Sequence, residues 1–165
     1  MTQEIYALSG ARNSSVANVF LAKFLPKRSG FASDYPVPEC ADSPTIVFPT
    51  TDTLMTYLDT NVQETYSIYW NNLDEVSQIR QAMLFYTSDG CLILGLAVAE
   101  SQSKRLLDGL IGFAGTQHGM FGHEERPPET AREFIQACQK SNARESRKQS
   151  KTPGPPGSSW QNLKR

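Results

Sequence analysis

Three short stretches of the chain have strand-like patterns: residues 4–8 alternate between apolar and polar positions, residues 45–48 form a β-branched run bounded by prolines, and residues 64–70 alternate again. A period of two residues is typical of β-strands with one face in the core. In the third stretch the alternation places Trp70 with the residues that face the core and Tyr69 with those that face outward. These three stretches are therefore predicted strands.

Two longer apolar runs, residues 82–87 and 91–98, flank the tripeptide Ser88-Asp89-Gly90. An Asp-Gly pair between apolar runs predicts a β-hairpin, because glycine adopts the positive φ that tight hairpin turns require. Both runs are almost entirely apolar, so we expect them at the centre of a sheet that helices cover.

Four further segments repeat apolar residues every three or four positions, which predicts amphipathic helices with apolar faces along residues 16–24, 54–58, 106–113 and 134–138. The first ends before Pro26, and residues 130–133 have the Thr-x-x-Glu pattern of a capping box. Gly109, Gly112 and Gly115 weaken the third helix, which we expect to fray early. The helix starts are marked by side chains able to cap near residues 13–15, 50–52, 101–103 and 130.

The predicted elements follow the order β-α-β-α-β-β-β-α-β-α, without the strict alternation of a parallel α/β fold. They predict an α+β fold: a mainly antiparallel sheet of about five or six strands, with helices packed on it and the Asp-Gly hairpin at its centre. Residues 118–123 are expected to form a short edge strand. The proline-rich residues 27–44 are predicted to be irregular but packed, because they include several apolar side chains.

Composition divides the chain after Lys140. Residues 1–140 contain 10 Lys/Arg and 16 Asp/Glu, a net charge of −6, whereas residues 141–165 contain 6 Lys/Arg and one Glu, a net charge of +5. The second segment is rich in Ser, Lys, Arg, Gln, Pro and Gly, so it predicts a disordered basic tail behind a single globular domain. The acidic domain disfavours nucleic acid as a direct ligand and favours a basic partner.

The apolar runs are all shorter than the roughly 20 residues that cross a bilayer. The first residues, MTQEIY, lack the basic and apolar regions of a secretion signal. The three cysteines form no CxxC pair, and their odd number favours reduced structural thiols. We therefore expect a cytoplasmic protein that does not contact the membrane.

A metal site would have to use the two histidines, His118 and His123, with Glu124 or Glu125. Neighbouring glycines argue against a helix in this region. On a strand, a separation of five residues places the two imidazoles on opposite faces. The pattern therefore favours polar turn or edge residues over metal ligands.

A nucleophile pair would have to join Cys91 or Cys138 to His118. Both cysteines lie in apolar stretches that do not stabilise a thiolate. The sequence also lacks a Gly-x-Ser-x-Gly elbow, a phosphate-binding loop and a dinucleotide fingerprint. We predict no catalytic residue, no cofactor and no metal ion.

Aromatic and acidic side chains are the candidates for binding a partner. Exposed tyrosine and tryptophan supply large contact areas at low entropy cost, and acidic pairs attract basic surfaces. The alternative is that the aromatics fill the core and that the acidic pairs form an ordinary solvated face. The candidate residues are Tyr69, Trp70, Asp74, Glu75, Glu124 and Glu125.

Residues 66–72, 79–96 and 119–130 resemble small bacterial immunity proteins of polymorphic toxin systems, and the likeness spans residues 1–140. The resemblance implies a protein without enzymatic activity that binds one cognate toxin domain and protects the producing cell and its siblings. Many such proteins are acidic because many of the toxins are basic nucleases.

We therefore predict an immunity protein that neutralises a cognate antibacterial toxin domain. The alternatives are a non-enzymatic adaptor or interaction module and a small enzyme with an unfamiliar site. An enzyme should have a concave pocket with convergent polar groups and perturbed pKa values. An inhibitor should instead have an acidic contact face with an aromatic centre.

Overall fold

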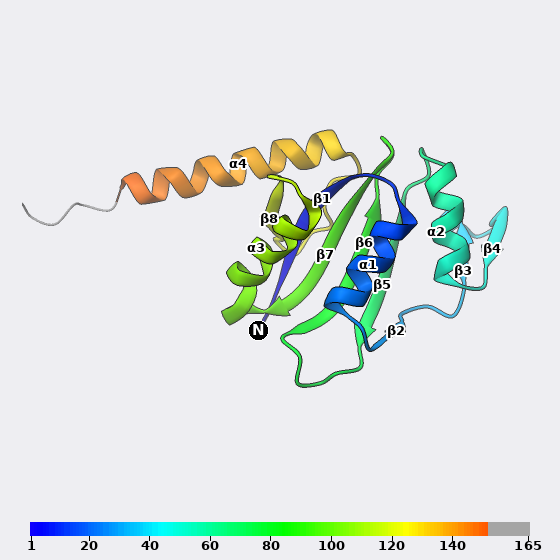
Figure 1. Ribbon diagram of the computed structural model, residues 1–165. Helices are drawn as coiled ribbons and strands as arrows, with labels where there is room; N and C mark the ends of the chain where they lie inside the picture. Colours follow the sequence, from blue (N-terminus) through cyan, green and yellow to red (C-terminus); the bar gives the residue numbers. More distant parts are fainter. Residues whose placement is uncertain (152–165) are drawn as a thin grey trace, which may run out of the picture.

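One antiparallel sheet of six strands organises the protein in the computed structural model, which describes residues 1–151. This sheet and its helices confirm the predicted α+β class. A second, small sheet pairs β3 (Tyr35–Val37) with β4 (Ile46–Phe48). The order across the large sheet is β2 (Arg28–Gly30), β5 (Tyr66–Asn72), β6 (Ile79–Tyr86), β7 (Cys91–Ala99), β1 (Thr2–Ala11) and β8 (Gly119–Phe121) (Figure 1).

The predicted Asp-Gly hairpin lies at the centre of this sheet. β6 and β7 pair in the register Tyr86↔Leu92 and Leu84↔Leu94, and Gly90 has a φ of +82° in the turn between them. Both strands are buried along most of their length, because helices or loops cover them on both faces. The prediction of a central hairpin is confirmed.

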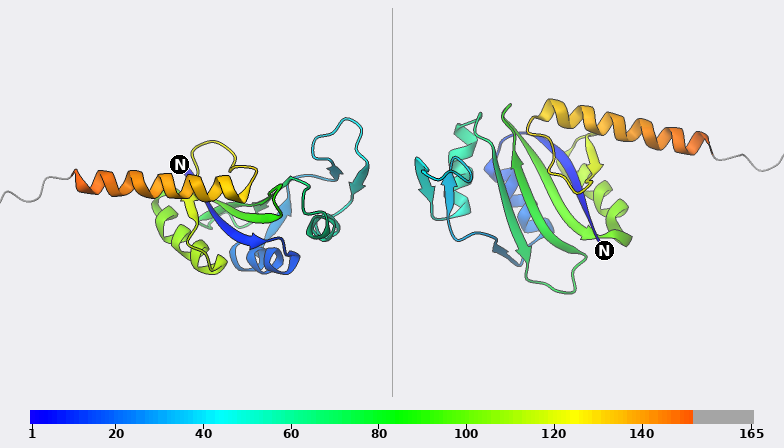
Figure 2. Two further views of the ribbon diagram at one scale, coloured as in Figure 1. Left: turned by 90° about the horizontal axis from the view of Figure 1, so that it is seen from above. Right: turned by 180° about the vertical axis from the view of Figure 1, so that it is seen from behind.

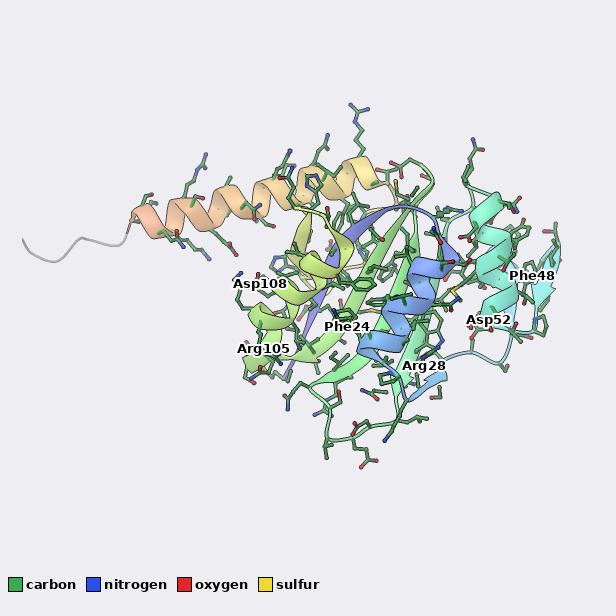
Figure 3. The ribbon with its side chains drawn as sticks, in the orientation of Figure 1. Phe24, Arg28, Phe48, Asp52, Arg105 and Asp108 are labelled. Atoms are coloured by element: carbon green, nitrogen blue, oxygen red, sulfur yellow. The ribbon has the colours of Figure 1, made fainter. Side chains whose placement is uncertain are left out.

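Helices α1 (Ser14–Phe24), α2 (Thr51–Thr60) and α3 (Ser103–Ala114) bury their apolar residues in one core cluster with the sheet. α1 and α3 cover the same face, which we call the α1/α3 face (Figure 2). The ring of Phe24 on α1 (Figure 3) packs against that of Phe113 on α3. Their ring centroids are 5.6 Å apart. A 3₁₀ turn, Glu100–Gln102, leads from β7 into α3.

The predicted helix caps are present at three N-termini. The side chain of Asn13 accepts a hydrogen bond from the N–H of Ser15 over 2.9 Å, and Thr50 caps α2 in a similar way. The hydroxyl of Thr130 accepts the N–H of Glu133 over 3.1 Å. Each cap satisfies an N–H group that has no partner inside its helix.

The expected early fraying of α3 is wrong. The helix continues through both of its internal glycines to Ala114 and ends where Gly115 adopts a left-handed φ of +63°. Leu107 and Leu110 of α3 are buried in the core. Their packing outweighs the roughly 1 kcal/mol that each glycine costs a helix.

Helix α4 (Ala131–Ser150) lies on the opposite face of the sheet, the α4 face. It continues past Lys140, which differs from the expected disorder after that residue. No Gly or Pro interrupts the helix, and residues 142–150, all exposed, consist mostly of good helix formers. The rest of the predicted tail, residues 152–165, lies outside the described residues. The buried residues of α4 are Ala131, Phe134 and Cys138.

The segment that was predicted to be irregular, residues 27–44, contains two short strands, β2 and β3. β2 continues the large sheet beside β5. Tyr35 and Val37 on β3 are buried in the core cluster, which confirms that the segment packs against the domain.

Asp89 connects the hairpin turn to the start of α4. Its Oδ1 accepts the N–H of Ala131 over 2.9 Å, and its Oδ2 accepts the N–H of Arg132 over 3.3 Å. Burial raises the pKa of Asp89, but hydrogen bonds that include these two outweigh burial, so the pKa lies below its ordinary value.

Replacing Asp89 with alanine should lower the free energy of unfolding by about 1 kcal/mol at pH 7, the usual cost of losing an N-terminal helix cap. The folded-state pKa of Asp89 is depressed. Its contribution is therefore present above an unfolded pKa of about 3.9 and is lost as the pH falls through the folded value. Urea unfolding of both proteins at pH 7 and pH 3 measures this difference. Asp108→Ala, at an exposed position of α3, is the control. An equal difference between Asp89→Ala and the wild type at both pH values would contradict the prediction.

Candidate partner-binding surface

Part of the α4 face is not covered by a helix. Helix α4 and the loop of residues 122–130 lie on one side of the sheet, while α1 and α3 lie on the other (Figure 2). The small β3–β4 sheet rises on the same side as that loop. β5 and the neighbouring end of β6 are therefore flanked on this face by residues 31–40, which include β3, and by the loop of residues 122–130.

An aromatic row crosses the α4 face from the covered part to the open part. Tyr6 on β1 contacts Phe85 on β6, Phe85 contacts Tyr69 on β5, and Tyr69 contacts Phe31 beyond β2, with ring-centroid separations of 5.7, 5.9 and 6.2 Å. Tyr6 is 2% exposed and Phe31 is 65% exposed. The row therefore begins in the core and ends at the surface.

Gly95 on β7 makes room for the buried end of this row. A Cβ atom at this position would lie 3.0 Å from the ring of Tyr6 on the neighbouring strand. Gly95 pairs regularly with Tyr6 and Met83 in the two adjacent ladders.

Two adjoining cavities lie at the open end of the row, and we call them together the β5 groove. The larger, about 220 Å³, lies between residues 31–40 and β5. The smaller, about 110 Å³, lies between residues 126–129 and the ends of β5 and β6. Glu39, Tyr66 and Ser67 line both cavities. The groove thus follows β5 between the two flanking segments.

The charged lining of the β5 groove is mainly acidic. Asp34, Glu39 and Glu129 line it against one cation, Arg126. Within residues 1–151, none of these three carboxylates forms an ion pair. The pKa of Glu39 is raised, because burial outweighs two effects that lower it. These are the 3.1 Å hydrogen bond from the N–H of Ser67 and the charge of Arg126. The surface therefore combines aromatic rings with unpaired negative charge.

The structure separates the two aromatic residues predicted to bind a partner. Tyr69 is half-buried and belongs to the aromatic row on the α4 face. Trp70 is 3% exposed and lies in the core cluster of the α1/α3 face. Adjacent strand residues point to opposite faces. Of these two aromatic residues, therefore, only Tyr69 can contact a partner on the α4 face.

Asp74 and Glu75 lie on the loop between β5 and β6, at the opposite end of β5 from Tyr66 (Figure 1). The Oδ1 atom of Asp74 accepts the N–H of Val76 over 3.2 Å, so this carboxylate helps to shape the turn. Neither acidic residue lines the β5 groove.

Glu124 and Glu125 are exposed on the 122–130 loop, the same loop that places Arg126 in the groove. Glu124 has a left-handed φ of +59° and lines a separate hollow beside the first residues of β1. The predicted acidic pair thus flanks the groove along the loop without lining it.

The sequence candidates did not include Phe31, Asp34 and Glu39, nor Arg126 and Glu129 of the other groove wall. For the first three, the one signal was the expectation that residues 27–44 pack against the domain. The contact itself depends on the pairing of β2 with β5, which continues as a 3.1 Å bond from the N–H of Phe31 to the carbonyl of Tyr69. This pairing is long-range and has no local sequence pattern.

The residues considered above as nucleophiles or metal ligands do not line the β5 groove; they are Cys91, Cys138, His118 and His123. Burial raises the pKa of Cys138 to about 11 and also raises that of Cys91, so both thiols are protonated at neutral pH. Among residues 1–151, no three His, Cys, Asp or Glu side chains are grouped as a metal ion requires.

Helices long and apolar enough to cross a bilayer do not occur in the described part of the chain. Comparison of the chain with protein-family models, with curated proteins and with solved structures gave no significant match.

Proposed function

We propose that this protein is an immunity-type inhibitor, which binds a basic toxin domain through the β5 groove and the two segments that flank it. The net charge of −6 on residues 1–140 supports a basic partner, because complementary charge accelerates association and disfavours wrong partners. The resemblance of residues 66–72, 79–96 and 119–130 to immunity proteins points in the same direction.

The observation that carries this proposal is the aromatic row that emerges between acidic side chains. Binding energy in protein interfaces concentrates in a few aromatic or arginine residues near the centre of the contact. Phe31 and Tyr69 offer such a centre. Asp34 and Glu39 line the same cavity, and Glu129 lines the adjoining one. An acidic face with an aromatic centre is what the inhibitor hypothesis required.

A functional test begins with affinity capture, using the full chain as bait in extracts of the bacterium that encodes it. We expect one stoichiometric partner, the toxin domain of a larger protein. Expression of that domain alone should stop growth of a host cell, and co-expression of this chain should restore growth. A captured partner without toxicity, or toxicity that this chain does not relieve, would overturn the proposal.

The variant Phe31→Ala should weaken binding of the toxin domain by about 10- to 100-fold, as expected for truncation of an interface centre. Isothermal titration calorimetry with the purified domain measures this. The matched control is Leu73→Ala, since Leu73 is 61% and Phe31 65% exposed. Leu73 lies beside Asp74 and Glu75. A larger loss for Leu73→Ala than for Phe31→Ala would move the binding site to the β5–β6 loop.

A further inference from the structure

The larger cavity of the β5 groove has room for a single amino-acid side chain. Its volume is about 220 Å³, below the roughly 300–1,000 Å³ of typical small-molecule sites. It opens beside the edge of β5, where residues 31–40 form its other wall. An occupant of this size fits a side chain that projects from a protein partner.

Aromatic rings form much of its wall. The rings of Phe31 and Tyr69 are inclined by 55°, and Tyr35 and Tyr66 also line the cavity. The face of an aromatic ring attracts cations because of its quadrupole. Phe31 is largely exposed, so its ring remains accessible to a partner.

Two carboxylates complete the lining, Asp34 and Glu39. In the described chain Glu39 uses Oε2 to accept the N–H of Ser67, while its Oε1 accepts no hydrogen bond. Arg126 lines the smaller, adjoining cavity and not this one. The larger cavity therefore has two acidic groups and no basic group among its lining residues.

We propose that this cavity receives a basic side chain, arginine or lysine, from the partner protein. The identity of that partner rests on the proposed function, whereas the preference of the cavity for a cation can be tested separately. A guanidinium or ammonium group would lie against Phe31 and Tyr69 and pair with Asp34 and Glu39. An anion would meet two like charges, and an apolar side chain would leave both carboxylates without a partner.

The probe is N-acetyl-arginine amide, with N-acetyl-citrulline amide as its uncharged counterpart of nearly equal shape. NMR titration of the full chain should show saturable shifts of the signals of Phe31 and Tyr69 with the arginine probe. The citrulline probe should bind at least about tenfold more weakly, because it lacks the charge. Equal binding of both probes, or shifts confined to other regions, would overturn the inference.

Two conservative variants test whether the arginine probe binds in the larger cavity. Glu39→Gln keeps an oxygen that accepts the N–H of Ser67, and Asp34→Asn changes an exposed residue. Each should weaken binding of the arginine probe by about fivefold or more. Glu75→Gln on the distant β5–β6 loop is the matched control and should leave the affinity unchanged. Unchanged affinity in both cavity variants would exclude this cavity as the site.

The two proposals can fail separately. If the arginine probe binds at Phe31 and Tyr69 but no toxic partner is captured, the proposed function is wrong and the cation site stands. If the toxin domain binds and is neutralised, while Glu39→Gln and Asp34→Asn alter neither toxin nor probe binding, the cation site is wrong and the proposed function stands.

Discussion

Replacing Arg12 with methionine should lower the free energy of unfolding by about 3–5 kcal/mol, the cost of breaking a buried charged network. Arg12 is 8% exposed at the end of β1. Its Nη1 donates to the carbonyls of Leu58 and Asn61 over 2.9 and 2.6 Å. Its Nη2 donates to the carbonyls of Thr87, over 2.6 Å, and of Glu64. One side chain thus joins β1, the end of α2, the approach to β5 and the hairpin.

The large effect follows from what methionine leaves behind. Its apolar stem resembles that of arginine but donates no hydrogen bonds, and each buried carbonyl without a partner costs about 1–3 kcal/mol. The substitution also removes a cation from the C-terminus of α2 and from the ring of Tyr86, whose centroid lies 5.3 Å from the guanidinium carbon. Arg12→Lys should be intermediate, because an ammonium group has three donors and a different geometry.

Urea unfolding monitored by circular dichroism measures this loss. Arg105→Met on α3 is the matched control, because Arg105 is exposed (Figure 3), and should change the stability by less than about 0.5 kcal/mol. A cost below about 1 kcal/mol for Arg12→Met would show that Arg12 does not hold these segments together.

The variant Phe134→Ala should lower the free energy of unfolding by about 3–5 kcal/mol, the usual cost of truncating a buried phenylalanine. Phe134 is fully buried and belongs to the cluster that includes Tyr6, Leu8 and Ile93 beneath α4. Its loss leaves a cavity where α4 contacts the sheet, so α4 should become more susceptible to proteolysis.

Phe31→Ala is the control for the same substitution at the other end of the α4 face. Phe31 is 65% exposed, so its truncation should change the stability by less than about 1 kcal/mol while weakening binding of the toxin domain. Thermal melting and limited proteolysis compare the two variants. Equal melting temperatures for Phe134→Ala and the wild type would show that α4 is not anchored through this residue.

Local patterns were sufficient to predict most of the fold. Asp89 and Gly90 marked the hairpin, and cap residues such as Asn13 and Thr130 marked helix starts, because each of these signals acts within a few residues. The glycines of α3 were misleading, since the burial of Leu107 and Leu110 is a tertiary effect that propensity does not include.

The candidate site was less accessible to sequence reasoning. Alternation along β5 correctly separated Tyr69 from Trp70, but it does not reveal which segment packs beside Tyr69. Phe31 reaches that position only through the pairing of Gly30 with Trp70 in the sheet. Acidic pairs such as Asp74-Glu75 stand out in a sequence. Asp34 and Glu39 come together only when residues 31–40 pack beside β5.

The position of β1 has a consequence for how the chain folds. β1 is synthesised before the other described strands, yet it pairs with β7 and β8, in registers such as Thr2↔Ala99 and Ile5↔Phe121. At about 5–20 residues per second, a ribosome needs about 5–20 s to extend the chain from Thr2 to Ala99. During this time the apolar residues of β1 have no strand partner, and such distant pairing slows folding. The newly made chain should therefore depend on chaperones until β7 emerges, and its ability to bind a partner should appear late in synthesis.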